Sequence, residues 1–175
     1  MTSWVALLRA VNVGGRWMKM AELVALCDKL GLVGARTYLQ SGNLLFSTKE
    51  ARSAISTKLE AAIEKTFGYR SEATLRSAAE LSELAGKNPF PKMAKDDPAH
   101  LVVNFLAGPP TADDKAALAV KWDGPETWKL VGSEVFICYP AGMGPSKLKL
   151  KLKTRATGRN WNVVTALAKL AAESG

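Results

Sequence analysis

The sequence holds little of the chemistry that defines the common enzyme classes. It has one histidine, His100, and two cysteines, Cys27 and Cys138, among 175 residues. A single histidine argues against both a histidine-based triad and a histidine-rich metal site, and neither thiol has a neighbouring base or a metal-ligand spacing. No dinucleotide or P-loop phosphate pattern occurs. We therefore identify no metal site, no cofactor and no catalytic residue in the sequence.

Long apolar segments are also absent. The longest, Trp4–Val13, is interrupted by Arg9 and is too short to cross a bilayer, and no secretory leader opens the sequence. Apolar residues make up 47% and charged residues 23%, which is ordinary for a globular protein. Cys27 and Cys138 lie in apolar patterns, as buried reduced thiols do. We expect a cytoplasmic protein with no membrane partner, and the oligomeric state stays open.

What the sequence has in excess is positive charge, with a net charge of +8. The stretch from Val135 to Ala172 has no Asp or Glu, and its basic residues are Lys147, Lys149, Lys151, Lys153, Arg155, Arg159 and Lys169. Such a bias favours an anionic partner, either a phosphate-bearing molecule or nucleic acid, and a solvated basic surface is the alternative.

The apolar periodicity predicts an α+β fold built twice from one pattern. Alternating and helical spacings in the first half indicate, in order, Trp4–Val13 (strand), Met20–Leu30 (helix), Arg36–Gln40 and Leu44–Ser47 (strands), Ile55–Phe67 (helix), Tyr69–Leu75 (strand) and Ala78–Ala85 (helix). The second half repeats this order, except that Ser146–Lys153 has the period of a strand where the pattern requires a helix. We predict a duplicated ferredoxin-like (β-α-β-β-α-β) plait with antiparallel sheets. Its parts are residues 1–87, a Pro-rich linker at 88–99, and residues 100–175.

This topology would bring two polar clusters together in the first half. The end of the first strand and the hairpin between the next two strands meet at one sheet edge, close to the start of the first helix. A tight turn at Gly14-Gly15 and a hairpin at Gln40–Asn43 are the favoured structural interpretations. Arg9, placed within an apolar strand, needs an acidic partner, a ring of carbonyl oxygens or a bound anion. The candidate ligand-binding residues are Arg9, Asn12, Gly14, Gly15, Arg16, Gln40, Ser41 and Asn43, with Arg159 and Asn160 expected to approach from the C-terminal segment.

Three ordered motifs carry a family resemblance. They are Leu7-Leu-Arg-Ala-Val-Asn-Val-Gly-Gly15, Arg36-Thr-Tyr-Leu-Gln-Ser-Gly-Asn-Leu-Leu-Phe46 and Thr157-Gly-Arg-Asn-Trp-Asn162, and Ser146-Lys147 forms a further match. Together they resemble the bacterial domain of unknown function 1697 family over nearly the whole chain. The resemblance implies a ferredoxin-like α+β fold and the positions of a site, but it implies no reaction.

Three functions fit these observations. The first is binding of a small anionic or phosphate-bearing ligand, such as a nucleotide, at the sheet edge of the first half. The second is a nucleic-acid-binding module that uses Lys147, Lys149, Lys151, Lys153 and Arg155. The third is an enzyme that works by positioning and electrostatics without metal or histidine.

Overall fold

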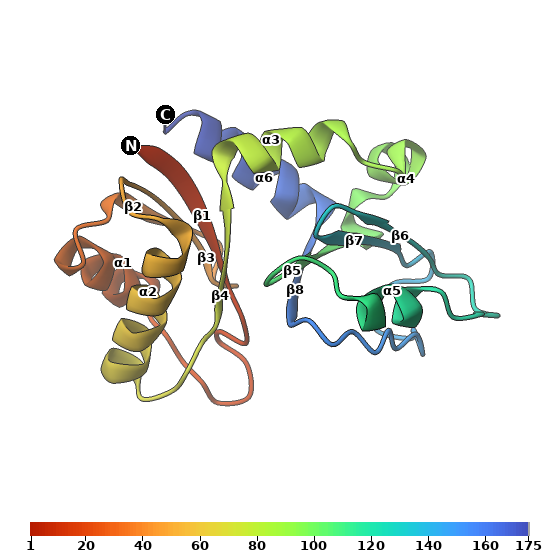
Figure 1. The fold of residues 1–175 in the computed structure, drawn as a ribbon, viewed down its shortest axis with the longest axis horizontal. Coiled ribbons are helices and arrows are strands. Elements are labelled where there is room, and N and C mark those ends of the chain that lie inside the picture. Colours follow the sequence, from red (N-terminus) through yellow and green to blue (C-terminus); the bar gives the residue numbers. More distant parts are fainter. Residues whose placement is uncertain (175) are drawn as a thin grey trace. The chain divides into compact units, whose positions relative to one another are not determined.

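The computed structural model describes residues 1–174, which form two compact α/β units (Figure 1). The first unit comprises Met1–Ser82 together with the chain from Leu167 onward, and the second comprises Glu83–Ala166. Each unit contains one four-stranded antiparallel sheet, and the described residues form six α-helices in total. The fold is therefore mixed α and β, as the sequence indicates.

The first unit has its four strands in the spatial order β2-β3-β1-β4. Its elements are β1 (Thr2–Leu8), α1 (Met20–Lys29), β2 (Val33–Tyr38), β3 (Asn43–Thr48), α2 (Arg52–Phe67) and β4 (Ala73–Ser77), followed by α3 (Ala78–Gly86). Gly31 and Gly68, both with positive φ, follow the ends of α1 and α2, where an L-residue with a side chain would be strained.

Helices α1 and α2 cover one face of this sheet (Figure 1). Alternate residues of β1, namely Trp4, Ala6 and Leu8, belong to the core that the two helices complete. From the helices this core takes Leu23, Cys27, Ile55, Leu59 and Ile63, which are all at most 1% exposed. Cys27 is fully buried in this core, and burial raises the pKa of its thiol to about 12, which disfavours the thiolate form.

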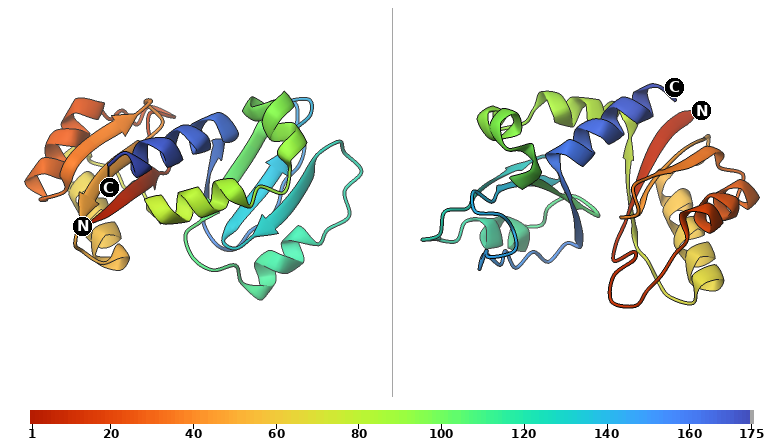
Figure 2. Two further views of the ribbon diagram at one scale, coloured as in Figure 1. Left: turned by 90° about the horizontal axis from the view of Figure 1, so that it is seen from above. Right: turned by 180° about the vertical axis from the view of Figure 1, so that it is seen from behind.

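The second unit has the strand order β6-β7-β5-β8. Its elements are α4 (Pro91–Asp96), the 3-10 helix η1 (Pro98–His100), β5 (Leu101–Leu106), α5 (Ala112–Leu118), β6 (Thr127–Val131), β7 (Glu134–Cys138) and β8 (Ala156–Asn160), and α6 (Trp161–Ala172) follows β8 directly. Residues 88–99, expected as a linker, thus include α4 and most of η1. Figure 2 shows α6 as one continuous helix.

The ambiguous segment Ser146–Lys153 forms neither a helix nor a strand. It is irregular chain, in which Leu148, Leu150 and Leu152 pack against the core of the second unit and the lysines between them are exposed. Leucines and lysines therefore do alternate between the core and the surface, as in a strand, but among the described residues no strand pairs with the segment. Between β7 and β8 the second unit has no counterpart of α2.

Three strand predictions need correction. The first strand ends at Leu8 and not at Val13, because the backbone turns into a left-handed conformation at Ala10. The second strand covers Val33–Tyr38 and not Arg36–Gln40. The fourth strand covers Ala73–Ser77 and not Tyr69–Leu75. Among the residues that the structure describes, no helix has the length and apolar character needed to span a membrane.

Candidate functional site

The candidate site is the loop cluster, which we define as residues 9–19 together with the β2–β3 turn at residues 39–42. The backbone of Arg9 forms hydrogen bonds with the segment that precedes β4. The Arg9 N–H donates to the Glu72 carbonyl oxygen (3.0 Å), and the Ser71 hydroxyl donates to the Arg9 carbonyl oxygen (2.8 Å). The Leu8 N–H donates to the Gly42 carbonyl oxygen (2.8 Å). These bonds fix the start of the long loop against both of its neighbours.

One side chain joins the two loops of the cluster. The Asn12 side-chain amide donates to the Gln40 carbonyl oxygen (2.9 Å), and its oxygen accepts from the backbone N–H of Met18 (2.8 Å). The sequence-based expectation that Asn12 and Gln40 lie close together is therefore met. Because both ends of its carboxamide bond to the backbone, Asn12 holds the 9–19 loop against the β2–β3 turn.

The backbone of the loop cluster is unusual. Ala10, Asn12 and Leu39 are the non-glycine residues with positive φ in the described chain, and all three lie in this cluster. Gly14 and Gly15 also have positive φ, and the Arg16 N–H donates to the Val13 carbonyl oxygen (3.1 Å) across them. This is the tight glycine turn that the sequence favours. Left-handed conformations at residues other than glycine are costly and concentrate at functional sites.

The β2–β3 turn is closed from inside by Asn43. This residue is fully buried, and its amide donates to the Tyr38 carbonyl oxygen (2.8 Å) and to the Ser41 hydroxyl (2.9 Å). Asn43 and Ser41, both expected to face a ligand, have these bonds within the hairpin. The Gln40 side chain is exposed and remains available at the surface of the cluster.

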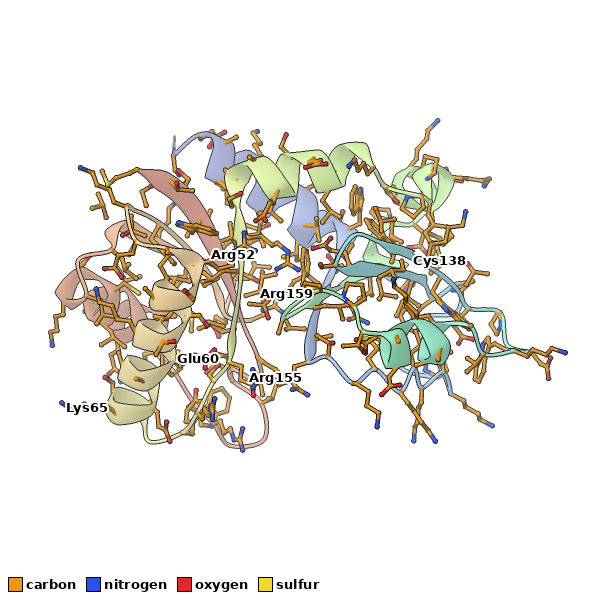
Figure 3. All side chains as sticks on the ribbon, viewed as in Figure 1. Arg52, Glu60, Lys65, Cys138, Arg155 and Arg159 are labelled. Carbon is orange, nitrogen blue, oxygen red and sulfur yellow. The ribbon has the colours of Figure 1, made fainter. Side chains whose placement is uncertain are left out.

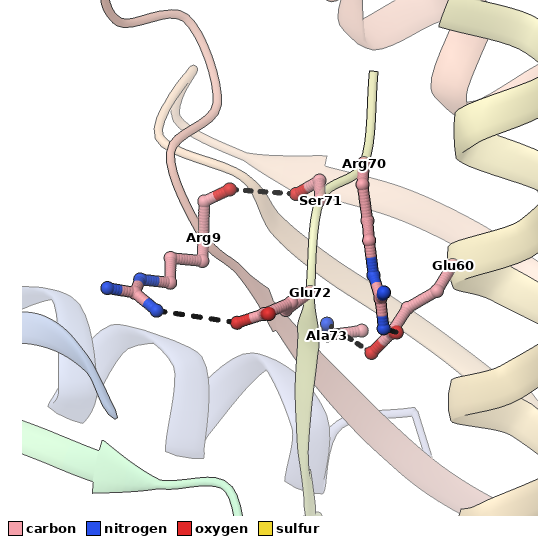
Figure 4. Close-up of polar contacts among 6 residues, drawn as sticks. All are labelled: Arg9, Glu60, Arg70, Ser71, Glu72 and Ala73. Atoms are coloured by element: carbon pink, nitrogen blue, oxygen red, sulfur yellow. Dashed lines mark hydrogen bonds and ion pairs between the residues drawn. The ribbon is translucent and has the colours of Figure 1, made fainter. Parts of the chain in front are cut away.

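Arg9 differs from the residue expected within an apolar strand. It follows the end of β1, its side chain is about half exposed, and it forms an ion pair with Glu72 (3.4 Å; Figure 4). In the same region Arg70 lies 3.7 Å from the Glu60 carboxylate, which also accepts from the Ala73 N–H (3.0 Å). Of the alternatives for Arg9, the structure shows the acidic partner.

The other two cations of the cluster make no ion pair among the described residues. The Arg16 guanidinium lies over the Tyr69 ring, 5.8 Å from its centre, and both Arg16 and Lys19 are exposed. Burial raises the pKa of Tyr69, and the nearby Arg16 charge opposes this rise. Two cations are therefore free to meet an anion.

A hollow of about 520 Å³ lies between these loops and the start of α1. Its lining residues are Asn12, Trp17, Met18, Lys19, Met20, Ala21 and Gln40. Lys19, at the N-cap position, provides no side-chain bond to the first turn of α1. The positive end of the helix dipole and its N–H groups therefore face the hollow without a cap.

The loop cluster carries exposed apolar side chains. Trp17, which lines the hollow, is 73% exposed, and Val13 and Leu39 elsewhere in the cluster are exposed by 55% and 54%. Trp17 and Lys19 are candidate site residues that no sequence motif indicated, because neither belongs to one of the polar clusters. The one sequence signal for these two residues was the predicted start of the first helix, which directly follows them.

Arg159 and Asn160 belong to the second unit, so their expected approach to the loop cluster stays a prediction. Arg159 lies on β8 (Figure 3) and is buried, which lowers the pKa of its guanidinium to about 10. It donates to the Thr157 hydroxyl (2.9 Å) and to the Gly158 carbonyl oxygen (2.8 Å). Asn160 accepts from the Val163 N–H (3.0 Å), as an N-cap of α6 does.

The basic segment has its cations at the surface of an irregular stretch of chain. Lys147, Lys149, Lys151, Lys153 and Arg155 are all exposed, while the leucines between the lysines face the core. Its end is fixed by the buried carboxylate of Asp114, which accepts from the backbone N–H groups of Lys153 (2.6 Å) and Thr154 (3.0 Å).

Fold and site together define a two-unit α/β protein with a structured loop cluster at one sheet edge. Residues 1–136 match the family described as "Protein of unknown function (DUF1697)", and the chain belongs to this family. The structure is similar to that of the conserved bacterial protein SP0830 from Streptococcus pneumoniae, with a TM-score of 0.81 and 22% identity over 98% of this chain and 99% of that chain. No curated protein matches the sequence significantly.

Proposed function

We propose that the protein binds a phosphate-bearing small molecule at the loop cluster. The observation that carries this proposal is the hollow at the uncapped N-terminus of α1, whose walls are joined by Asn12. Unsatisfied N–H groups and the helix dipole attract phosphate. Lys19 lines the hollow and Arg16 lies three residues before it in the same loop, so two positive charges are near the helix N-terminus. A nucleotide fits this arrangement, since its base can stack on the exposed Trp17 ring.

Replacing Arg16 and Lys19 together with alanine tests this proposal. We expect the dissociation constant for inorganic phosphate and for AMP to rise about tenfold or more, because two charge-assisted hydrogen bonds to the phosphate are removed. The measurement is a titration followed by tryptophan fluorescence, and Trp17→Phe identifies the signal from the rim of the hollow.

A variant with Lys29→Ala and Lys65→Ala is the matched control, since these lysines lie in the last turns of α1 and α2 and neither lines the hollow. It removes positive charge without touching the hollow and should leave the dissociation constant nearly unchanged. Equal losses in both proteins would mean that phosphate responds only to net charge, and failure of the wild type to bind either probe would contradict the proposal.

Nucleic-acid binding through the basic segment is the second candidate function. It is favoured by the exposure of Lys147, Lys149, Lys151, Lys153 and Arg155 along one continuous stretch of sequence. Neighbouring cations of the segment are two residues apart in sequence and all are exposed, which suits contact with several phosphates of a nucleic acid.

Changing the four lysines of this segment to glutamine should then remove most of the salt dependence. For duplex DNA, the slope of log K against log salt should fall by about 0.9 for each phosphate that the segment no longer neutralises. Fluorescence anisotropy with a labelled duplex and with a labelled single strand measures it. The leucines that hold the segment are unchanged, so the protein should still fold.

A variant with Lys49, Lys65, Lys95 and Lys121 changed to glutamine has the same net charge, and all four of these lysines are exposed outside the segment. It should keep the wild-type slope. If the two variants behave alike, the basic segment is only a solvated surface.

We also infer that the two units are copies of one ferredoxin-like plait. Both have the strand order of that fold, and their fourth strands pair with the first at the same register. Ala73-Thr74-Leu75-Arg76 in β4 and Ala156-Thr157-Gly158-Arg159 in β8 occupy equivalent positions, and a helix follows each strand directly. In both copies the threonine and the arginine are buried.

The two free cysteines support a reducing compartment. Cys27 and Cys138 are both buried and unpaired with each other. We propose the cytoplasm on this basis, since thiols stay reduced there.

A further inference from the structure

The second unit contains a hollow at the place where the first unit is filled by a helix. In the first unit Ala6 of β1 pairs with Leu75 of β4, and both residues belong to the core that α2 completes. The equivalent pair in the second unit is Asn104 and Gly158. Because irregular chain replaces the crossover helix there, this pair lines a hollow of about 370 Å³.

A carboxamide in the middle of a central strand is unusual, and that of Asn104 is half-buried. Its side chain makes no hydrogen bond with any described residue. Gly158 provides the space it occupies, since a Cβ at that position would lie 2.6 Å from the Asn104 side-chain oxygen. The pair therefore keeps a donor and an acceptor free at the wall of the hollow.

Two rings flank the same hollow. His100 is the last residue of η1, and its Nδ1 lies 2.7 Å from the Asp97 carboxylate. Since a carboxylate accepts, Nδ1 carries the proton and Nε2 is left for another partner. The Tyr139 ring is buried, and its hydroxyl forms no hydrogen bond among the described residues. Both rings line the hollow beside Asn104.

The lining indicates the chemistry of a ligand. It contains no carboxylate and no lysine, and its one permanent cation, Arg159, is hydrogen-bonded to Thr157 and to the Gly158 carbonyl oxygen. A side-chain carboxamide whose N–H₂ and C=O groups are both free can form two hydrogen bonds with a planar molecule that has a donor next to an acceptor. The edges of nucleobases have this arrangement. Rings beside it can stack on such a plane. The volume is within the range of small-molecule sites.

We propose that this hollow binds a neutral nucleoside, whose base is recognised by the Asn104 carboxamide and flanked by His100 and Tyr139. The site is independent of the loop cluster, because every residue of its lining belongs to the second unit and a nucleoside carries no phosphate.

The test is a titration of the full chain with adenosine, guanosine, cytidine and uridine, followed by NMR. His100 is the single histidine, so its imidazole signals report on the hollow without ambiguity. We expect at least one nucleoside to shift these signals saturably, with a dissociation constant of about 1 mM or below. Asn104→Ala should raise that constant about tenfold or more.

Asn104→Ala introduces the residue that the first unit has at the equivalent position, so it should fold, and circular dichroism checks this. Asn162→Ala, on the exposed side of α6, is the matched control and should bind as the wild type does. Arg16→Ala with Lys19→Ala should also leave nucleoside binding intact, which separates this proposal from phosphate binding at the loop cluster. The proposal is overturned if none of the four nucleosides shifts the His100 signals, or if Asn104→Ala binds as tightly as the wild type. Should Asn104→Ala fail to fold, His100→Ala decides in the same way, with the binding followed by thermal shift.

Discussion

Gly42→Ala is expected to destabilise the protein by about 2–5 kcal/mol. Gly42 has φ of +80°, and a Cβ there would lie 2.9 Å from the Leu8 Cβ and 3.1 Å from a Val11 methyl group. The new methyl group therefore adds a left-handed backbone penalty to overpacking against two buried side chains. Urea unfolding followed by circular dichroism measures the loss.

Gly68→Ala separates these two contributions. Gly68 has nearly the same φ, +78°, but no side chain or backbone of the described residues beyond its immediate chain neighbours lies within 4 Å of the position its Cβ would take. We expect this variant to lose only the backbone penalty, about 1–2 kcal/mol. Equal losses in the two variants would show that the contacts with Leu8 and Val11 are easily relieved.

The effect of Gly42→Ala should extend to binding. Leu8 donates to the Gly42 carbonyl oxygen, and the neighbouring Gln40 accepts from Asn12. A displaced turn would therefore separate the walls of the hollow at α1. Weaker phosphate binding is expected from this variant and not from Gly68→Ala.

Asp114→Asn is the second substitution with a large expected effect. The Asp114 carboxylate is fully buried and accepts from the Thr154 hydroxyl (2.5 Å), the Thr111 N–H (2.8 Å) and the N–H groups of Lys153 and Thr154. An asparagine amide would place N–H groups against these donors. We expect the melting temperature to fall by several degrees, with the basic segment loosened before the rest of the unit.

The same carboxylate predicts how stability depends on pH. The bond from the Thr154 hydroxyl, followed by those from the backbone of Thr111 and Thr154, lowers the pKa of Asp114 well below its usual range. A group with a depressed folded-state pKa stabilises the fold above its unfolded pKa, about 3.9 for aspartate. The advantage of the wild type over Asp114→Asn should therefore be constant at neutral pH and shrink as the pH falls below about 4.

Asp113→Asn is the control, since Asp113 is exposed in the same first turn of α5. It changes the charge equally but has no buried donors to satisfy. Thermal melts from pH 7 to about pH 3 compare the three proteins. A pH-independent difference between wild type and Asp114→Asn would show that the charge of Asp114 is not what stabilises the native state.

Most of the secondary structure could be predicted because local signals and tertiary environment agree. Thr111 begins α5 with a capping box to Asp114, and Gly31 and Gly68 follow helix ends as their conformational freedom allows. The order of strands follows from the repeated pattern. The family is also predictable, because its motifs are long and occur in order.

The errors lie where tertiary contacts override local preference. Nothing in the residue types of Ala10 or Leu39 signals a left-handed backbone, so the apolar pattern predicts a first strand that is too long. Strand β8 contains Gly158 and Asn160, both poor strand formers, and exists because β5 pairs with it. The apolar pattern continues past Arg9 and so predicts that this residue lies within a strand. Its partner Glu72 is distant along the chain, and the sequence alone therefore does not indicate the ion pair. The sequence does not indicate that Asn104 lines a hollow, because this depends on the absence of a counterpart of α2 in the second unit.

Helix α6 has a consequence for the order in which the protein is made. The chain from Leu167 onward belongs to the first unit, where Arg36 donates to the Leu170 carbonyl oxygen (2.8 Å) and to the Ser174 hydroxyl (2.7 Å). During synthesis these residues leave the ribosome after the whole of the second unit. The unit that is begun first is therefore completed last, and a fragment ending at Ser82 lacks part of it.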